Sequence, residues 1–274
     1  MSASWMIARY EMKRAFRSRW LLLLSLLFVS LAFISIFMTN ATSTSQYDGF
    51  TRQMASLLNV SLFILPLMTI LIGSMLVAGE KEDGQLLLYR TYPISPTALV
   101  IGKWLGLFLP LAVMLTLGYG IALLVLSFLM PVRLGLAVAF YLIALLLITL
   151  FLSFSLWVGY RVKSRLHAIG VSLFSWAFFV LFYEFLIIAL TFVLPATQIV
   201  TVLTVSVFFN PVEIVRVGAI LALESGTFFG PSMYDFTIWA TSLFGIVAFI
   251  IASLAWIIIP LIGSIRLVKK GNHL

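Results

Sequence analysis

The sequence predicts an all-α integral membrane protein with six transmembrane helices. Of its 274 residues, 63% are hydrophobic and only 9% are charged, and the mean hydropathy is +1.18. A soluble domain of that composition would expose a large apolar surface. The apolar residues also gather in six long runs with few charges, close to the roughly 20 residues that a helix needs to cross a bilayer core. No stretch alternates between apolar and polar residues as the strands of a membrane barrel do.

The six runs are the expected spans, and the basic residues orient them. The spans are residues 20–39, 61–79, 104–130, 134–158, 168–194 and 236–263. Cytoplasmic loops carry the excess of Lys and Arg. Of the 17 basic residues, only Arg52, Arg133 and Arg216 fall on the side opposite the two ends of the chain. We therefore expect a multi-pass protein of the plasma membrane with both termini in the cytoplasm.

One membrane-spanning domain, residues 1–274, accounts for the whole chain. Three segments are expected outside the bilayer core, residues 1–19, 80–103 and 195–235. The net charge of +8 is spread over short basic segments beside the helices, which favours contact with lipid headgroups and no binding of nucleic acid. With no cysteine and no grouped histidines, the sequence predicts no metal site.

Residues 1–19 have the pattern of an amphipathic helix. Apolar side chains share one face, and basic side chains share another: Trp5, Ala8, Met12 and Phe16 against Arg9, Lys13 and Arg17. Such a helix lies along a membrane surface, with its basic face toward anionic lipid. It can equally serve as a contact surface for a cytoplasmic subunit, and the pattern leaves both roles open.

Residues 80–103, between the second and third spans, form the most polar interruption of the chain. They open with three acidic side chains, Glu80, Glu82 and Asp83, followed by Gly84. Such a concentration of charge at a membrane exit requires water or a partner protein. We interpret this segment as a cytoplasmic loop.

A short helix is predicted within this loop, over residues 85–91. It must end before Pro93, because the residue that precedes a proline is biased away from helix. Ser95 and Pro96 then have the character of an N-cap and a first helical residue. The helix carries three consecutive leucines, Leu86, Leu87 and Leu88. Leucines are unfavourable in water, which favours a docking helix over the alternative of a solvated loop.

The pattern of this loop resembles that of ABC-2 type transporter permeases. The residues that carry the resemblance are Glu80, Glu82, Gly84, Leu86, Leu87, Pro93, Ser95, Gly102 and Lys103. The order of spans, leading helix and loops extends it over the whole chain, and the subgroup that serves copper-enzyme maturation is the most similar. Gln85 departs from the family, which often has Thr there.

The resemblance implies that residues 80–103 contain a coupling helix, which docks on a separate ATP-binding subunit. Two copies of the permease and two ATPases would form the transporter, with the substrate path between the copies. ATP and magnesium would belong to the partner, because this sequence contains no phosphate-binding loop of the type G-x-x-x-x-G-K-[ST] and no cofactor site. We therefore expect a permease subunit that catalyses no reaction of its own. We expect the direction of transport to be export.

Residues 195–235 form the longest expected outer loop. Asn210 and Pro211 predict a helix start, and the helix would run to Glu224 before Gly226. A short interfacial helix between the last two spans is one interpretation, and a gate or a dock for an extracytoplasmic accessory protein is the other. Within this helix, Glu213 and Arg216 are three residues apart, so they share a face and can pair.

Glu184, next to Tyr183, is the only ionisable side chain expected inside a span. A carboxyl at that depth is costly and points to function. It can be protonated and hydrogen-bonded to Tyr183, Ser175 or another span, or it can belong to the translocation path. A secondary carrier or channel that uses Glu184 is the alternative function. No second carboxyl or histidine accompanies it within a span, and no inverted repeat is visible, which disfavours that alternative.

Overall fold

The computed structural model describes residues 3–41, 46–129, 131–222 and 234–271, and the part of the chain within those ranges is helical, without strands. The first half comprises α1 (Ala3–Phe16), α2 (Arg19–Ala41), α3 (Gln46–Glu82), α4 (Gln85–Thr91), α5 (Pro96–Leu129) and α6 (Leu134–Arg161). The second half comprises α7 (Arg165–Ala177), the π-helical turn η1 (Phe178–Phe182), α8 (Tyr183–Val193), α9 (Ala196–Phe209), α10 (Pro211–Ala222), α11 (Tyr234–Thr241) and α12 (Leu243–Lys270).

Five helical segments are long and apolar enough to cross a membrane: Arg52–Glu82, Pro96–Phe128, Leu134–Arg161, Arg165–Val193 and Leu243–Lys270. Two further pairs pass the same test as broken spans. The first joins α1 to α2 with a bend of 66°, and the second joins α9 to α10 with a bend of 109°. By length and composition the described residues thus provide five to seven spans, a range that includes the expected six.

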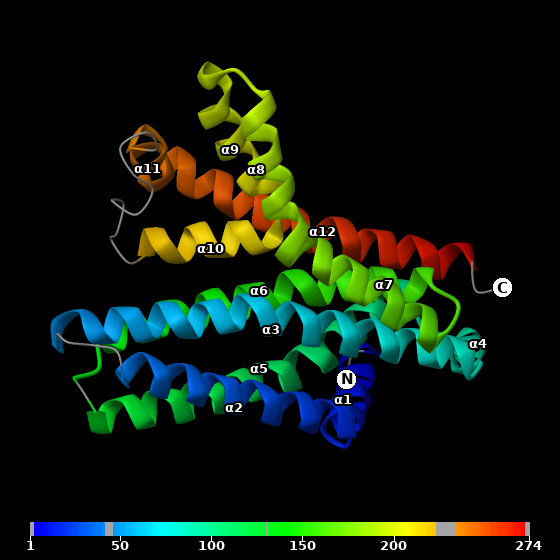
Figure 1. Cartoon of the computed structure of the whole chain (residues 1–274). Helices are drawn as coiled ribbons and strands as arrows, with labels where there is room; N and C mark the ends of the chain where they lie inside the picture. The colour runs from blue at the N-terminus through cyan, green and yellow to red at the C-terminus, as the bar shows by residue number, and fades with distance from the viewer. Residues whose placement is uncertain (1–2, 42–45, 130, 223–233, 272–274) are drawn as a thin grey trace.

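The long helices lie side by side, with α6 in the middle of the bundle (Figure 1). Half of α6 is buried, because α3, α5, α10 and α12 all pack on it. Small residues allow the closest of these contacts: a Cβ atom on Gly159 of α6 would lie 2.9 Å from the carbonyl oxygen of Ser74 in α3. Close backbone approach through small residues is how membrane helices gain packing energy, since lipid is as apolar as their side chains.

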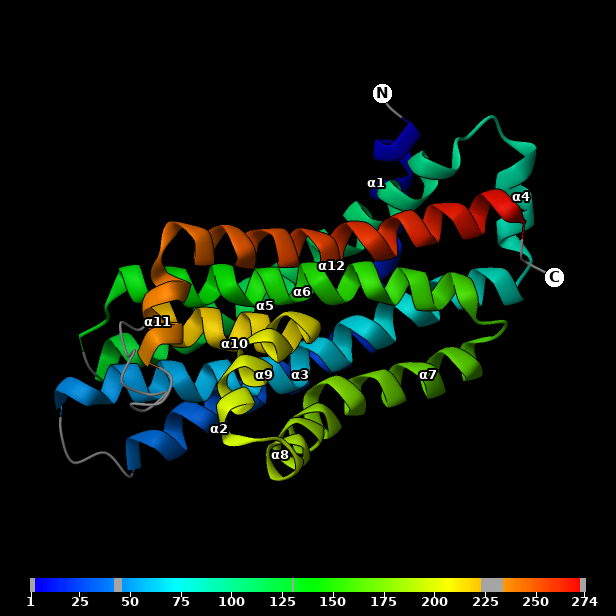
Figure 2. The same ribbon diagram turned by 90° about the horizontal axis from the view of Figure 1, so that it is seen from above.

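The two ends of the bundle differ. Helix α4, helix α1 and the last turns of α3, α6 and α12 gather at one end, which we call the α4 end (Figures 1 and 2). The first and last described residues also lie there. Away from that end, α8 and α9 diverge from the long helices (Figure 1). At the α4 end, α1 crosses the direction of α2.

Several expected boundaries are wrong. Helix α3 continues through the first acidic residues to Glu82 and α5 begins at Pro96, so Gly102 and Lys103 are helical and the connection is shorter than residues 80–103. The last long helix begins at Leu243, capped by Ser242, rather than at residue 236. Hydropathy marks the apolar centre of a helix, whereas backbone hydrogen bonds and caps decide its ends.

Residues 195–235 contain α9, α10 and the start of α11. Helix α10 packs on α6 and α12, and Val212, Ile214 and Val215 are buried. The predicted helix start at Asn210 and Pro211 is confirmed. Its predicted end at Glu224 and Gly226 lies outside the described residues. Several apolar side chains of α10 are therefore covered by the bundle.

Candidate functional site

Helix α4 forms a short projection between α3 and α5. Gly84 starts it with a φ of 71°, a left-handed conformation that favours glycine, and its N–H donates to the Lys81 carbonyl at 3.1 Å. Tyr92 is extended and ends the helix before Pro93. The Ser95 hydroxyl accepts a hydrogen bond from the Ala98 N–H at 3.2 Å, at the start of α5. The predicted short helix and the predicted cap are both confirmed.

Four charged residues lie beneath α4 and form what we call the buried charge cluster: Glu11, Arg14, Glu80 and Lys103. Glu80 is its centre, because one carboxylate oxygen lies 2.6 Å from Arg14 Nη1 and the other lies 2.5 Å from Lys103 Nζ. Lys103 also pairs with Glu11. The side chains of Glu80 and Lys103 have no exposed area. Three elements, α1, α3 and α5, are thereby joined by charge at one point.

Two acids and two bases make the buried charge cluster neutral, and that balance is what allows its burial. An ion taken out of water loses several kcal/mol of hydration, which only close partners offset. Two polar atoms near it, Glu11 Oε2 and the Tyr160 hydroxyl, are buried without a hydrogen-bond partner in the described residues. Such a pair of orphaned atoms is the usual setting for a buried water.

Helix α4 rests on this cluster through two side chains. Leu86 is buried against the core, and the Tyr89 ring lies with its centre 5.3 Å from Lys103 Nζ. An ammonium at that distance from an aromatic face is attracted by the ring quadrupole. Burial raises the pKa of Tyr89, so the phenol stays neutral. The position of α4 is therefore fixed to the same point that joins α1, α3 and α5.

Three residues of the predicted coupling set, Glu80, Leu86 and Lys103, are buried inside the chain. Their part in coupling to an ATP-binding subunit stays a prediction. The charged pattern of the segment did not reveal which side of each helix faces inward. The side chain of Leu87 lies outside the described residues.

The exposed surface of this end combines other members of the predicted set with three further residues, Leu88, Thr91 and Tyr92. Exposed side chains are Glu82, Asp83, Leu88, Thr91, Tyr92, Pro93 and Ser95. Beside them, a hollow of about 420 Å³ lies between Tyr92, Ile94 and the last turn of α12 at Val268. An exposed apolar and aromatic projection next to a hollow is a surface to which a second protein can bind.

Glu82 and Asp83 also hold the start of α7. A Glu82 carboxylate oxygen accepts a hydrogen bond from the Arg165 N–H at 2.8 Å, and Asp83 pairs with the Arg165 guanidinium at 2.5 Å. Lys81 donates to the Val162 carbonyl at 3.0 Å, at the end of α6. A movement of the α3 end would therefore carry α7 with it.

Helix α1 packs on α5 through one face, and its predicted position at the membrane surface stays a prediction. Its buried residues are Ile7, Ala8, Glu11 and Ala15, which lie on α5. Gly106 of α5 makes the approach possible, since a Cβ atom there would be 2.7 Å from the Ala8 carbonyl oxygen. Of the predicted apolar face, Ala8 is buried, whereas Trp5 and Phe16 are exposed. The basic side chains Arg9, Lys13 and Arg17 are exposed as well.

Glu184 lies far from α4 and has a partner that the sequence did not indicate. Its carboxylate pairs with Arg216 of α10, which also lies 3.1 Å from Glu213. The Glu213–Arg216 pairing predicted from spacing is confirmed. The proposed partner Tyr183 instead donates its hydroxyl to the Ser206 carbonyl at 2.6 Å. Glu184 is thus one member of an ion-paired group between α8 and α10.

The break between α9 and α10 is closed by side chains. The Asn210 amide oxygen accepts from the Val212 N–H at 2.9 Å, and its nitrogen donates to the Phe179 carbonyl in η1 at 2.8 Å. Trp256 of α12 donates to the Phe208 carbonyl at 3.1 Å. Pro211 has no N–H to offer the end of α9. In a membrane, freed backbone groups need such partners.

Taken together, a bundle of long apolar helices with a short projecting helix at one end defines a multi-pass membrane protein. The profile of the family described as ABC-2 family transporter protein matches residues 5–271. The chain therefore belongs to the ABC-2 family and is a permease subunit of an ABC transporter, a multi-pass protein of the plasma membrane. Membership implies a separate ATP-binding subunit.

Two relatives carry the same printed name. The chain is 33% identical over 224 residues to the "Probable ABC transporter permease protein NosY" of Stutzerimonas stutzeri, a match that covers 79% of this chain and 80% of the relative. It is 36% identical over 198 residues to the protein of that name from Pseudomonas aeruginosa, covering 69% and 71% respectively. Both matches agree with the subgroup resemblance that the sequence analysis identified.

The charge cluster was missed at its α1 end. Glu11 is the one acid in a basic helix, four residues before Ala15 and three after Ala8. That spacing places it on the small-residue face, and Gly102 and Gly106 supply a matching small-residue face four residues apart. Both signals were present, although neither identifies the partner of Glu11.

Proposed function

We propose that this permease couples ATP hydrolysis in a separate subunit to rearrangement of its own helices through α4. The observation that carries the proposal is the connection of α4 to the buried charge cluster. Leu88 and the C-cap Tyr92 are exposed for docking, while on α4 Leu86 is buried in the core and Tyr89 lies against Lys103 of the cluster. A force applied to α4 is then transmitted to α1, α3 and α5 together.

A second copy of the chain completes the transporter in this proposal, with the substrate path between the copies and export as its direction. The ATP-binding subunit carries ATP and magnesium. The similarity to proteins named NosY supports a cargo connected with copper-enzyme maturation. On the opposite side, α9 to α11 offer a surface for an extracytoplasmic accessory protein.

Pairing of Glu184 with Arg216 weighs against the alternative of a secondary carrier. A carrier of that kind needs a carboxyl that loses and gains a proton during transport. In the described structure the Glu184 carboxylate is instead held in an ion pair with Arg216. We therefore place the energy source in the partner ATPase.

The test is ATPase stimulation in a reconstituted complex of the permease with the ATP-binding subunit that co-purifies with it. Leu88→Asp should abolish stimulation, because a carboxylate replaces the exposed apolar contact, while the variant still inserts in the membrane. Thr97→Asp is the matched control, since Thr97 is exposed at the same end but lies on α5. Normal stimulation in Leu88→Asp would reject α4 as the docking helix.

A further inference from the structure

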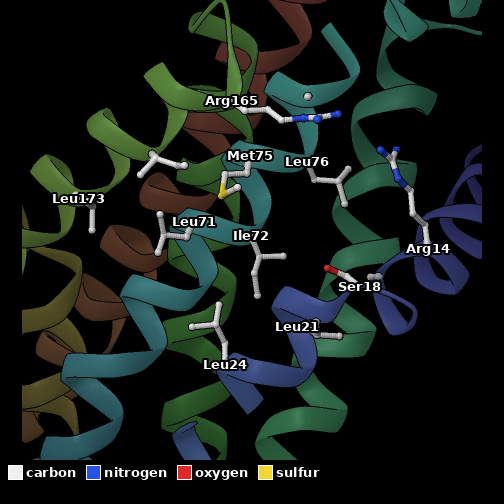
Figure 3. Close-up of a pocket in the computed structure, with 13 residues that line it drawn as sticks. Arg14, Ser18, Leu21, Leu24, Leu71, Ile72, Met75, Leu76, Arg165 and Leu173 are labelled. Carbon is white, nitrogen blue, oxygen red and sulfur yellow. The ribbon is translucent and has the colours of Figure 1, made fainter. Parts of the chain in front are cut away.

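A cavity of about 390 Å³ opens between α2, α3 and α7, and one of its lining residues, Arg14, also belongs to the buried charge cluster. Its walls are apolar, formed by Leu24, Leu71, Met75 and Leu173 among others. Figure 3 shows two guanidinium groups, those of Arg14 and Arg165, together at one end of it. This end is the α4 end of the bundle. The volume lies within the usual range for small-molecule pockets.

The two arginines come from elements far apart in the sequence, α1 and the first residue of α7. Arg165 lies across α3 at Gly79, where a Cβ atom would collide with its guanidinium. Glycine at this position therefore gives the side chain its path to the mouth of the cavity. A larger residue at position 79 would therefore displace the Arg165 side chain from its present position.

Each arginine keeps hydrogen-bonding capacity for a ligand. Arg14 pairs with Glu80 and Arg165 pairs with Asp83, but a guanidinium has five N–H donors. Their side chains are 32% and 49% exposed. Planar guanidinium groups are well suited to bind phosphate oxygens in pairs.

We propose that this cavity binds an anionic glycerophospholipid, with its phosphate between Arg14 and Arg165 and an acyl chain along the apolar walls. The charged mouth and the apolar walls together require a ligand that carries both a negative headgroup and an apolar chain. Its charged mouth lies at the end of the spans, the level of lipid headgroups, on the side that the Lys and Arg count assigns to the cytoplasm. A free phosphate ion would leave the apolar walls uncovered. The headgroup of a zwitterionic lipid would bring its own positive charge close to the two arginines.

Lipid retention measured by native mass spectrometry tests this proposal without the ATPase. The full chain is purified in mild detergent with equal amounts of phosphatidylglycerol and phosphatidylcholine. We expect retained phosphatidylglycerol to exceed phosphatidylcholine several-fold. A basic residue near headgroups contributes a factor of about five in lipid binding, so Arg165→Gln should lower phosphatidylglycerol retention about fivefold.

Two further variants separate the contributions of charge and shape. Met75→Trp should reduce retention by filling the cavity while leaving every arginine in place. Arg9→Gln is the matched control, because it removes an exposed arginine of α1 that does not line the cavity. Neither Arg165→Gln nor Met75→Trp alters the buried charge cluster, so both variants should fold.

The outcomes that would overturn the proposal are specific. Equal retention of both lipids by the unaltered chain would reject selectivity for an anionic lipid. Full retention in both Arg165→Gln and Met75→Trp would place the bound lipid elsewhere. Displacement of the lipid by millimolar inorganic phosphate, with Met75→Trp unaffected, would mean that the mouth binds free anions and that the walls hold no acyl chain.

Discussion

The α4 end of the bundle and the region of α8 to α10 place charge in opposite ways. At the α4 end, Glu80 and Lys103 are fully buried and join three helices at one point. In the other region, the ion pair of Glu184 and Arg216 is 41% and 30% exposed and joins short helices around a π-helical turn and a bend of 109°. The first arrangement suits transmission of force, and the second suits rearrangement, since its backbone is already broken and held by side chains.

The largest effect should come from removing the positive centre of the buried charge cluster. Lys103→Met leaves Glu11 and Glu80 buried without their main partner, which should lower the free energy of unfolding by about 3 to 5 kcal/mol. Thermal unfolding in detergent measures the change, with Lys163→Met as control because Lys163 is exposed. Adding Glu11→Gln and Glu80→Gln should recover much of the loss. A Lys103→Met protein as stable as the parent would show that burial of the cluster contributes nothing to the fold.

A second effect concerns the contact of α1 with α5. Gly106→Ala places a methyl group against the Ala8 carbonyl and should cost about 1 to 3 kcal/mol of unfolding free energy. The same helix contains an internal control, since a Cβ atom on Gly120 would meet nothing within 4 Å. If Gly106→Ala and Gly120→Ala behave alike, α1 does not pack on α5 as described.

In the other region, Asn210 is the sharpest test. Asn210→Ala removes the helix cap on Val212 and the hydrogen bond to the Phe179 carbonyl, and should cost about 2 kcal/mol of unfolding free energy. Thermal unfolding of this variant can be compared with that of Asn59→Ala, an exposed asparagine of α3. An unchanged midpoint would show that the break needs no side-chain support.

The smallest effect should be the coupling between Glu184 and Arg216. A double-mutant cycle with Glu184→Gln and Arg216→Gln should give a coupling energy of about 0.5 to 1 kcal/mol, because both side chains are partly exposed. Transport by the reconstituted complex should survive Glu184→Gln. Loss of transport without loss of stability would return Glu184 to the substrate path and narrow the difference between the two regions.

Local patterns in the sequence were sufficient for much of this structure. Apolar runs longer than a bilayer span indicated the long helices, and Gly84, Pro93 and Ser95 indicated the short helix between α3 and α5. Asn210 and Pro211 likewise marked the start of α10. The signals other than the apolar runs act within a few residues, through a cap, a missing N–H or a positive φ. They can therefore be interpreted without knowing the fold.

The tertiary structure decided which of these residues meet. Glu80 and Lys103 read as surface charges of a loop, but α1 brings Glu11 and Arg14 to them from more than 60 residues away. Arg216 reaches Glu184 because α10 packs into the bundle as a helix. Burial and pairing of a charge depend on the surfaces of several helices at once. Spacing along one helix fixes its faces, and only packing decides which face is inside.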